Sequence, residues 1–161
     1  MNKPWLEQYS EGVAPEISLE RYQSLAHFIE DACERWQGRS AFENMGKQIT
    51  YNEVERLSAK FGAFLQHSGL QKGDRVAIMM PNLLQYPIVL FGILRAGLVA
   101  VNTNPLYTPR ELKHQLSDSG ARAIIILENF AHVLEEVIAD TQVETIAVSY
   151  THLTLPTMMS V

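Results

Sequence analysis

Glycine spacing shows whether the sequence carries a phosphate-binding loop, because glycine lets a backbone approach a phosphate closely. No two of the nine glycines stand two residues apart, so the G-x-G-x-x-G fingerprint of dinucleotide-binding proteins is absent. Gly92 and Gly97 have the spacing of a Walker loop, but Leu98 and Val99 follow where that loop needs Lys and Ser or Thr. We therefore expect these two glycines to close a helix rather than to bind phosphate.

The histidines and serines give no metal site and no nucleophile. None of the five histidines is paired with Cys or another His at metal-ligand spacing. His114 and Asp118 are four residues apart on one helix face and could serve a metal or a proton relay, but a solvated surface is favoured. Ser117 and Ser119 are typical of a frayed helix end, and no G-x-S-x-G elbow occurs. The sequence thus predicts no catalytic and no metal-binding residue.

Cys33 is the single cysteine, which excludes an internal disulfide and a cysteine-rich zinc site. It falls between Ile29 and Trp36 on a helical pattern, so we expect a buried, inert thiol. A chain with so little cysteine fits a reducing cytoplasm.

The loop from Asn102 to Thr108 is the strongest local candidate for function. It follows the carboxyl end of a predicted strand, where α/β sheets bind ligands, and it contains Tyr107. However, Asn104 and Pro105 are also ordinary turn residues, and Thr108 is predicted to cap a helix. A structural role is favoured, so the residues alone predict no identifiable active site and no cofactor-binding residue.

The elements that must position these residues alternate between helices and strands. A helix is predicted from Ser24 to about Gly38, and two strands within 41–49 join at Met45-Gly46. Capping boxes predict two further helix starts, and apolar runs predict four strands. The helices are 50–69, 82–95, 108–119 and 130–138, and the strands are 75–80, 98–103, 123–127 and 144–148. The alternation of strands and helices predicts an α/β fold with a parallel sheet built of βαβ units.

Two further details belong to this prediction. Asn82 is expected to cap the helix that runs to Arg95, which would make Pro87 an internal kink. Residues 1–20 are expected to be an arm that lies over the domain and contains no regular element.

Length and composition indicate one globular domain of 161 residues, with 47% hydrophobic and 19% charged residues. The net charge of −5 and the scattered 13 Lys and Arg argue against nucleic-acid binding. The start lacks the apolar run of a signal peptide, and the apolar stretch Pro87–Leu94 is too short to span a bilayer.

Three segments of the sequence closely resemble the AMP-forming acyl-CoA synthetases, nearest to the bacterial long-chain fatty acid CoA ligases. They are Met79–Pro87, Phe91–Gly97 and Asn104–Leu112, and the last is the most specific. Shorter stretches that share the likeness are Arg21–Leu25, Lys72–Ala77, His114–Leu116 and Asp118–Ala121. The resemblance covers residues 1–148 and implies a partial N-terminal subdomain of the large domain of an adenylate-forming synthetase.

The resemblance also implies a reaction in two steps. ATP, accompanied by Mg²⁺, and a long-chain fatty acid would give an acyl-adenylate and pyrophosphate, and coenzyme A would then displace AMP. The family's phosphate loop, acidic motif, hinge and lysine-bearing lid lie downstream of this region, so no catalytic residue can be carried over. We expect the fragment to bind none of these cofactors and to be inactive in isolation.

The resemblance ends near Ser149. The segment Ser149–Thr157 resembles the translated read-through of a sequencing adapter, so residues 149–161 are expected to be a non-native tail. Two alternatives to a long-chain ligase remain open. One is another adenylate-forming ligase with a medium-chain, aryl or peptide-synthetase substrate, and the other is a non-catalytic α/β binding module. The expected location is cytoplasmic, either free or peripheral on the inner face of the membrane.

Overall fold

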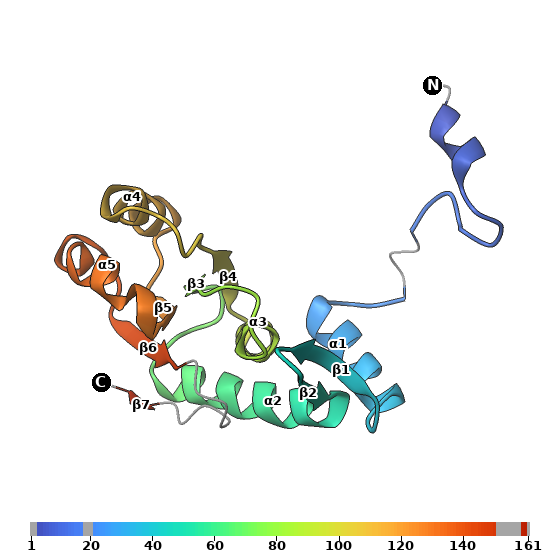
Figure 1. The fold of residues 1–161 in the computed structure, drawn as a ribbon, viewed down its shortest axis with the longest axis horizontal. Helices are drawn as coiled ribbons and strands as arrows, with labels where there is room; N and C mark the ends of the chain where they lie inside the picture. The colour runs from blue at the N-terminus through green and yellow to red at the C-terminus, as the bar shows by residue number, and fades with distance from the viewer. Residues whose placement is uncertain (1–2, 18–20, 151–158, 161) are drawn as a thin grey trace.

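The computed structural model describes residues 3–17, 21–150 and 159–160, and its centre is a parallel β-sheet (Figure 1). The parallel strands are β3 (Arg75–Met79), β4 (Val99–Asn102), β5 (Ala123–Leu127) and β6 (Thr145–Ser149). They lie in the order β4-β3-β5-β6, and β7 (Met159–Ser160) pairs antiparallel with β6. The predicted α/β class, with βαβ units and a parallel sheet, is confirmed.

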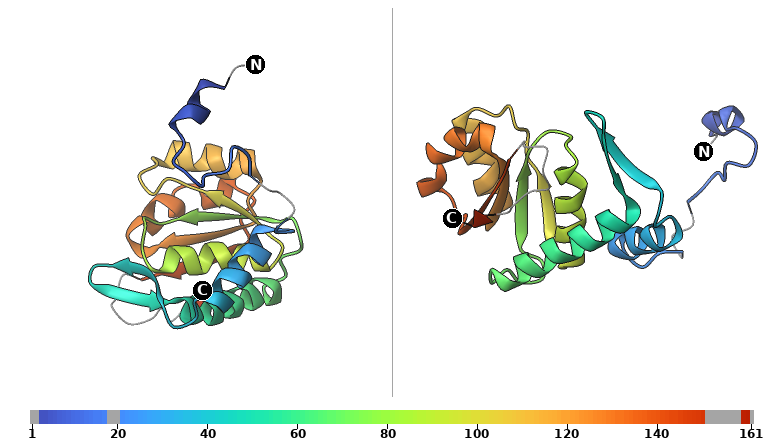
Figure 2. Two further views of the ribbon diagram at one scale, coloured as in Figure 1. Left: turned by 90° about the vertical axis from the view of Figure 1, so that its right-hand side faces the viewer. Right: turned by 60° about the horizontal axis from the view of Figure 1, so that its bottom comes forward.

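Helices cover both faces of this sheet, which the left view of Figure 2 shows as three layers. One layer holds α2 (Tyr51–His67) and α3 (Gln85–Arg95), and the other holds α4 (Pro109–Ser119) and α5 (Ala131–Glu135). Successive side chains of a strand point to opposite faces, so β3, β5 and β6 supply both cores.

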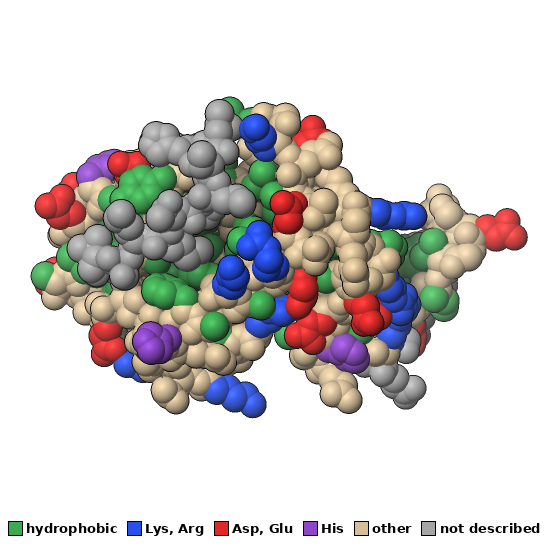
Figure 3. Space-filling view, turned by 90° about the horizontal axis from the view of Figure 1, so that it is seen from below, with side chains coloured by type: hydrophobic (Ala, Val, Ile, Leu, Met, Phe, Trp, Pro, Cys, Tyr) green, Lys and Arg blue, Asp and Glu red, His purple; other side chains and the backbone are tan. Residues whose placement is uncertain are grey.

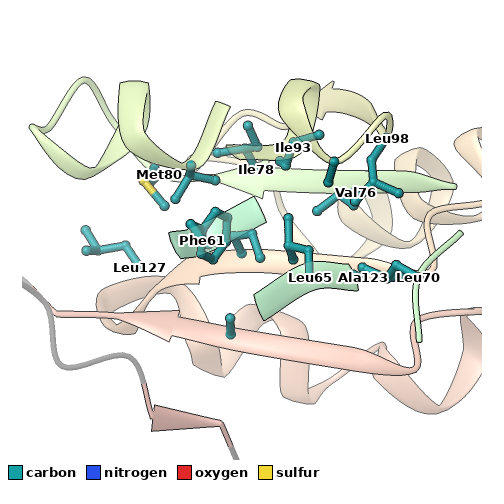
Figure 4. Packing of buried hydrophobic residues seen from close by; sticks show 14 residues of the cluster. Phe61, Leu65, Leu70, Val76, Ile78, Met80, Ile93, Leu98, Ala123 and Leu127 are labelled. Carbon is teal, nitrogen blue, oxygen red and sulfur yellow. The ribbon is translucent and has the colours of Figure 1, made fainter. Parts of the chain in front are cut away.

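Strand β3 illustrates this division of the core. Val76 and Ile78 pack on the side of α2, where Phe61 and Leu65 meet them (Figure 4), whereas Met79 packs on the side of α4. Every residue of β5 is buried, as its unbroken apolar sequence predicts for a strand covered on both faces.

A third group of elements packs on the outer side of α2 and α3. It consists of α1 (Leu25–Arg35) and the hairpin of β1 (Ser40–Asn44) and β2 (Lys47–Thr50), whose apolar side chains form a separate cluster. The hairpin turns at Met45 and Gly46, both with positive φ, which suits the twist of a two-residue turn.

Both predicted capping boxes are present. The hydroxyl of Thr50 accepts a hydrogen bond from the amide of Glu53, and the Glu53 carboxylate accepts one in return from the Thr50 amide. Thr108 and Glu111 form the same reciprocal pair at the start of α4. Since these signals need only residues three apart, the sequence alone could place both helix starts.

Helices α2 and α3 approach each other closely at two glycines. A Cβ atom on Gly62 would lie 2.9 Å from the backbone oxygen of Gly92, and a Cβ on Gly92 would lie 2.7 Å from the Phe61 ring. The expectation that Gly92 closes a helix is therefore wrong. Gly92 instead permits the close contact between α2 and α3. Gly97, with a φ of +76°, closes α3 as predicted.

The predicted start of α3 at Asn82 is wrong. The helix begins at Gln85 and its N-cap is Leu84, without a side-chain capping bond. This start places Pro87 in the first turn, where backbone amides have no partner inside the helix, so the proline costs no helical hydrogen bond. A start at Asn82 would have put the ring against the carbonyl of the preceding turn.

Three smaller expectations also differ from the structure. The helix predicted over 130–138 is broken into a 3-10 turn (Glu128–Phe130), α5 and a second 3-10 turn (Ile138–Asp140), because Val137 leaves the helical region at φ −127°. The strand predicted over 144–148 is shifted by one residue. The arm carries a 3-10 helix (Pro4–Gln8), and Figure 1 shows its described residues beside the domain rather than over it.

The surface on the α2 side of the molecule mixes acidic and basic side chains, as Figure 3 shows. Within the described ranges, no helix is both long and apolar enough to cross a bilayer.

Candidate site at the carboxyl edge of the sheet

The connections of the sheet change direction between β3 and β5. From β3 the chain crosses to β4 on one side and then returns past β3 to form β5 on the other side. Ligands of open α/β sheets bind where the crossovers change direction in this way. The geometry therefore selects the carboxyl edge as the candidate site.

The carboxyl edge is held by neutral hydrogen bonds. The Tyr86 hydroxyl donates to Oδ1 of Asn102 at 2.7 Å, and Gln85 Nε2 donates to the carbonyl of Tyr150 at 3.1 Å. Buried Thr103 donates its amide to the Ile78 carbonyl, which extends the ladder beyond β4. These groups could orient a polar ligand, and none of them is charged.

The loop Asn102–Thr108 has the turn chemistry that the sequence favoured. Oδ1 of Asn104 accepts a hydrogen bond from the Leu106 amide at 3.0 Å, and the Asn104 carbonyl accepts one from the Tyr107 amide at 3.1 Å. The Tyr107 ring packs against the core on the α4 side, so its contacts are structural.

The amino edge of the same sheet is tied by charged groups instead. Arg122 donates to Asp74 at 2.7 Å and also to Glu144, which links the starts of β3, β5 and β6. Arg75 donates to the carbonyls of Ser119 and Gly120 at 3.0 and 2.6 Å, which closes the end of α4. A backbone amide at Gln71, and then Arg122, hold the pKa of Asp74 below its usual value.

A cleft of about 300 Å³ opens beside the carboxyl edge, between the β1–β2 hairpin and the first turns of α3. The two walls are joined by a hydrogen bond from Asn44 Nδ2 to the Asn82 carbonyl at 3.0 Å. The lining residues are Phe42, Glu43, Asn44, Asn82, Leu83, Leu84, Tyr86, Pro87, Leu90 and Phe91.

The other candidates of the sequence lie away from this cleft. His114 and Asp118 are exposed on α4, and the Ser119 hydroxyl donates to the Gln115 carbonyl at the helix end. Cys33 is buried, and burial, followed by the nearby Glu55 carboxylate, raises the pKa of its thiol to about 11. At neutral pH this thiol is protonated and unreactive.

The described residues include no metal-binding cluster and no glycine-rich phosphate loop. Within 3–17, 21–150 and 159–160 there is no group of three His, Cys, Asp or Glu side chains that could hold a metal ion. The positive-φ glycines of this region lie singly at turns and helix ends rather than in a phosphate-binding loop. We therefore derive no catalytic step through ATP or Mg²⁺ from these residues.

Sequence reasoning missed the residues that build the cleft. Asn44 and Asn82 are 38 positions apart, and Tyr86 and Asn102 are 16 apart, so no local spacing reveals their contacts. The available signal was that Asn82 follows β3 and Asn102 ends β4, and the carboxyl ends of both strands lie at the same edge.

Comparison with known proteins gives the family. The family described as AMP-binding enzyme matches residues 29–158. The long-chain-fatty-acid--CoA ligases of Salmonella typhimurium and Yersinia pestis are 58% and 59% identical over 145 and 144 residues, which are 89% of this chain and 26% of each relative. The chain thus spans about a quarter of the length of these relatives.

A solved structure agrees with the sequence relatives. The long-chain-fatty-acid-CoA ligase from Archaeoglobus fulgidus superimposes with a TM-score of 0.72 at 26% identity, over 78% of this chain and 27% of that one. This superposition confirms the fold that the resemblance implied. Because the family match covers most of the sequence, the chain belongs to the AMP-binding enzyme family.

Proposed function

We propose that this chain is the first parallel-sheet unit of a long-chain fatty acid CoA ligase. The observation that carries the proposal is the 58% identity to relatives named for that activity, over 89% of the chain. The segment Asn104–Leu112, which is the most specific part of the resemblance, also supports the proposal. It forms the turn at the carboxyl edge and the capped start of α4.

The proposed reaction of the complete enzyme has two balanced steps. A fatty acid carboxylate oxygen bonds to the α-phosphorus of ATP, and the bond to pyrophosphate breaks. The thiol of coenzyme A then gives up its proton to the solvent, its sulfur bonds to the acyl carbon, and the bond from that carbon to the AMP oxygen breaks. Mg²⁺ would accompany the ATP. We place the enzyme in the cytoplasm, either free or at the inner face of the membrane.

In this proposal the described residues support the reaction without performing it. They supply a rigid sheet and a neutral carboxyl edge, whereas the groups that hold ATP and Mg²⁺ come from other parts of the enzyme. We propose that residues 1–148 are synthetase sequence, that 149–161 are a separate tail, and that the 161-residue chain alone is inactive.

The test compares two proteins. The genomic locus is sequenced past codon 148, and the complete reading frame and the 161-residue chain are both purified. With palmitate, ATP and coenzyme A, the complete protein should form AMP and palmitoyl-CoA in equal amounts, and the short chain should form neither.

Three results would count against the proposal. A stop codon directly after position 161 would favour a binding module, and AMP formation by the short chain would refute its inactivity. A complete protein that activates octanoate or benzoate but not palmitate would assign another acid.

A further inference from the structure

Strand β4 ends the sheet on one side. It pairs with β3, and no described residue pairs with its other side. On the opposite side of the sheet the last strand is β7, which has two residues and pairs antiparallel with β6. Among the described residues, β4 is therefore the longer of the two outer strands and the one that offers a free edge to a further strand.

The hydrogen bonds of β4 alternate along the strand. The amides of Val99 and Thr103 donate at 2.9 and 3.0 Å to carbonyls on the β3 side. In a parallel ladder every second residue makes these bonds, so Val101 also faces β3. The amides and carbonyls of Ala100 and Asn102 point the other way, and no described residue bonds them.

The side chains of this edge carry no charge. Val99 is 46% exposed, and Val101 is partly exposed and belongs to none of the buried clusters. The sequence contains no Asp, Glu, Lys or Arg between residues 96 and 108. Edge strands are commonly protected from pairing by a lysine, a proline or a bulge, and β4 has none of these within its four residues.

We propose that β4 is a self-association site, at which two copies of this chain pair their β4 strands antiparallel about a twofold axis. Val101 of each copy lies at the axis, opposite Val101 of the second copy. Ala100 then faces Asn102 of the second copy, and each such pair exchanges two hydrogen bonds. A second copy fits this edge because the pattern is self-complementary and brings no like charges together.

The proposed contact closes on itself. It uses the β4 edge of both copies, and the other outer strand of each sheet, β7, is only two residues long. A contact that uses the same surface on both partners gives a dimer and not a filament. The inference concerns the 161-residue chain and goes beyond the proposed ligase function, on which it does not depend.

The first experiment is sedimentation equilibrium of the 161-residue chain over a range of concentrations. A contact of one short strand pair should give a Kd of about 0.1 mM, so the monomer dominates at about 10 µM and the dimer at about 1 mM. A protein that remains monomeric at the highest concentration, or that grows beyond a dimer, would overturn the proposal.

Amide exchange locates the contact without any variant. Between about 50 µM and about 1 mM, exchange at Ala100 and Asn102 should slow about threefold, in step with the falling fraction of monomer. The Val101 amide is the internal control, because it faces β3 in monomer and dimer alike and should keep its rate. Dimerisation without slower exchange at Ala100 and Asn102 would place the contact elsewhere and refute the proposal.

Charged variants at the axis test the register. Val101→Lys alone and Val101→Glu alone each place two like charges face to face and should weaken dimerisation about tenfold, whereas an equal mixture should form a mixed dimer. Met45→Lys adds the same charge on the hairpin turn, where Met45 is 87% exposed, and should leave the Kd unchanged.

Two results with these variants would contradict the proposal. They are a Kd of either Val101 variant equal to that of Met45→Lys, or a mixture that stays monomeric. Circular dichroism shows whether each variant is folded. If a Val101 variant unfolds, the exchange rates of Ala100 and Asn102 in the unaltered chain decide the question.

Discussion

The two edges of the sheet are built from different interactions. At the amino edge, Arg75 and Arg122 tie strand starts and the end of α4 with charge-assisted hydrogen bonds. At the carboxyl edge, Tyr86, Asn102 and Gln85 make neutral hydrogen bonds, and an apolar cleft opens beside them.

This difference predicts that the two edges contribute unequally to stability. Hydrogen bonds to charged groups are about twice as strong as neutral ones, so the amino edge fixes the strands. The neutral hydrogen bonds of the carboxyl edge contribute less. The comparison predicts that removing a hydrogen-bond donor lowers the free energy of unfolding more at the amino edge than at the carboxyl edge.

The largest expected loss of stability comes from weakening the contact between α2 and α3. This contact supports both edges of the sheet, because α3 starts at the carboxyl edge and ends at the amino edge. Gly62→Ala would place a methyl group 2.9 Å from the Gly92 oxygen and push α2 from α3. We expect the free energy of unfolding to fall by about 1–3 kcal/mol, measured by urea denaturation. Gly38→Ala, with open space around its Cα, is the control, and an equal loss there would contradict the packing explanation.

At the amino edge, Arg75→Met removes the donors to the carbonyls of Ser119 and Gly120 while it keeps most of the side-chain volume. We expect a loss of about 2 kcal/mol in the free energy of unfolding, because the donor is charged and the acceptors are partly buried. Urea denaturation measures it, and hydrogen exchange should show faster opening at the end of α4. If Arg75→Met lost less stability than the carboxyl-edge variant Tyr86→Phe, the comparison of the two edges would be reversed.

At the carboxyl edge, Tyr86→Phe deletes only the hydroxyl that donates to Asn102. The expected loss is about 0.5 kcal/mol, since the bond is neutral and exposed. Denaturation of this variant and of Arg75→Met under the same conditions gives the comparison directly. Similar values for the two variants would show that the edges do not differ in strength.

The smallest expected change in the free energy of unfolding at neutral pH comes from the charge of Asp74. Because the folded-state pKa of Asp74 is lowered, this carboxylate stabilises the fold above its unfolded pKa of about 3.9, and the contribution is lost as pH falls through the folded value. The stability difference between wild type and Asp74→Asn should therefore shrink as the medium becomes acidic.

Salt distinguishes the two causes of that lowered pKa. The Gln71 amide is the larger cause and is hardly screened, whereas the attraction of Arg122 is screened. Most of the difference between wild type and Asp74→Asn should persist at high salt. Complete loss at high salt would assign the effect to Arg122 alone.

The sequence could predict the elements whose signals are local. The capping boxes at Thr50 and Thr108 and the glycine at 120 mark helix ends within a few residues, and each was correct. The start of α3 was not predictable from Asn82, because the Asn82 carbonyl is engaged by Asn44 from a distant hairpin and Pro87 favours a later start.

The candidate site was less predictable than the fold. Its position at the carboxyl edge follows from the strand order, which the alternation of helices and strands does not determine. The role of Gly92 depends on how closely α2 passes, and the cleft depends on where the hairpin folds back. Each is a property of tertiary packing, so no periodicity or motif records it.

The strand order also has a consequence for synthesis on the ribosome. β3 and β4 can pair as soon as residue 102 has emerged, but the other side of β3 waits for β5, about 25 residues later. At the usual 5–20 residues per second this interval is about 1–5 s. During that time one side of β3, whose residues 76–79 are buried in the finished fold, is a bare edge, so the nascent chain is vulnerable to aggregation while residues 103–127 are being made.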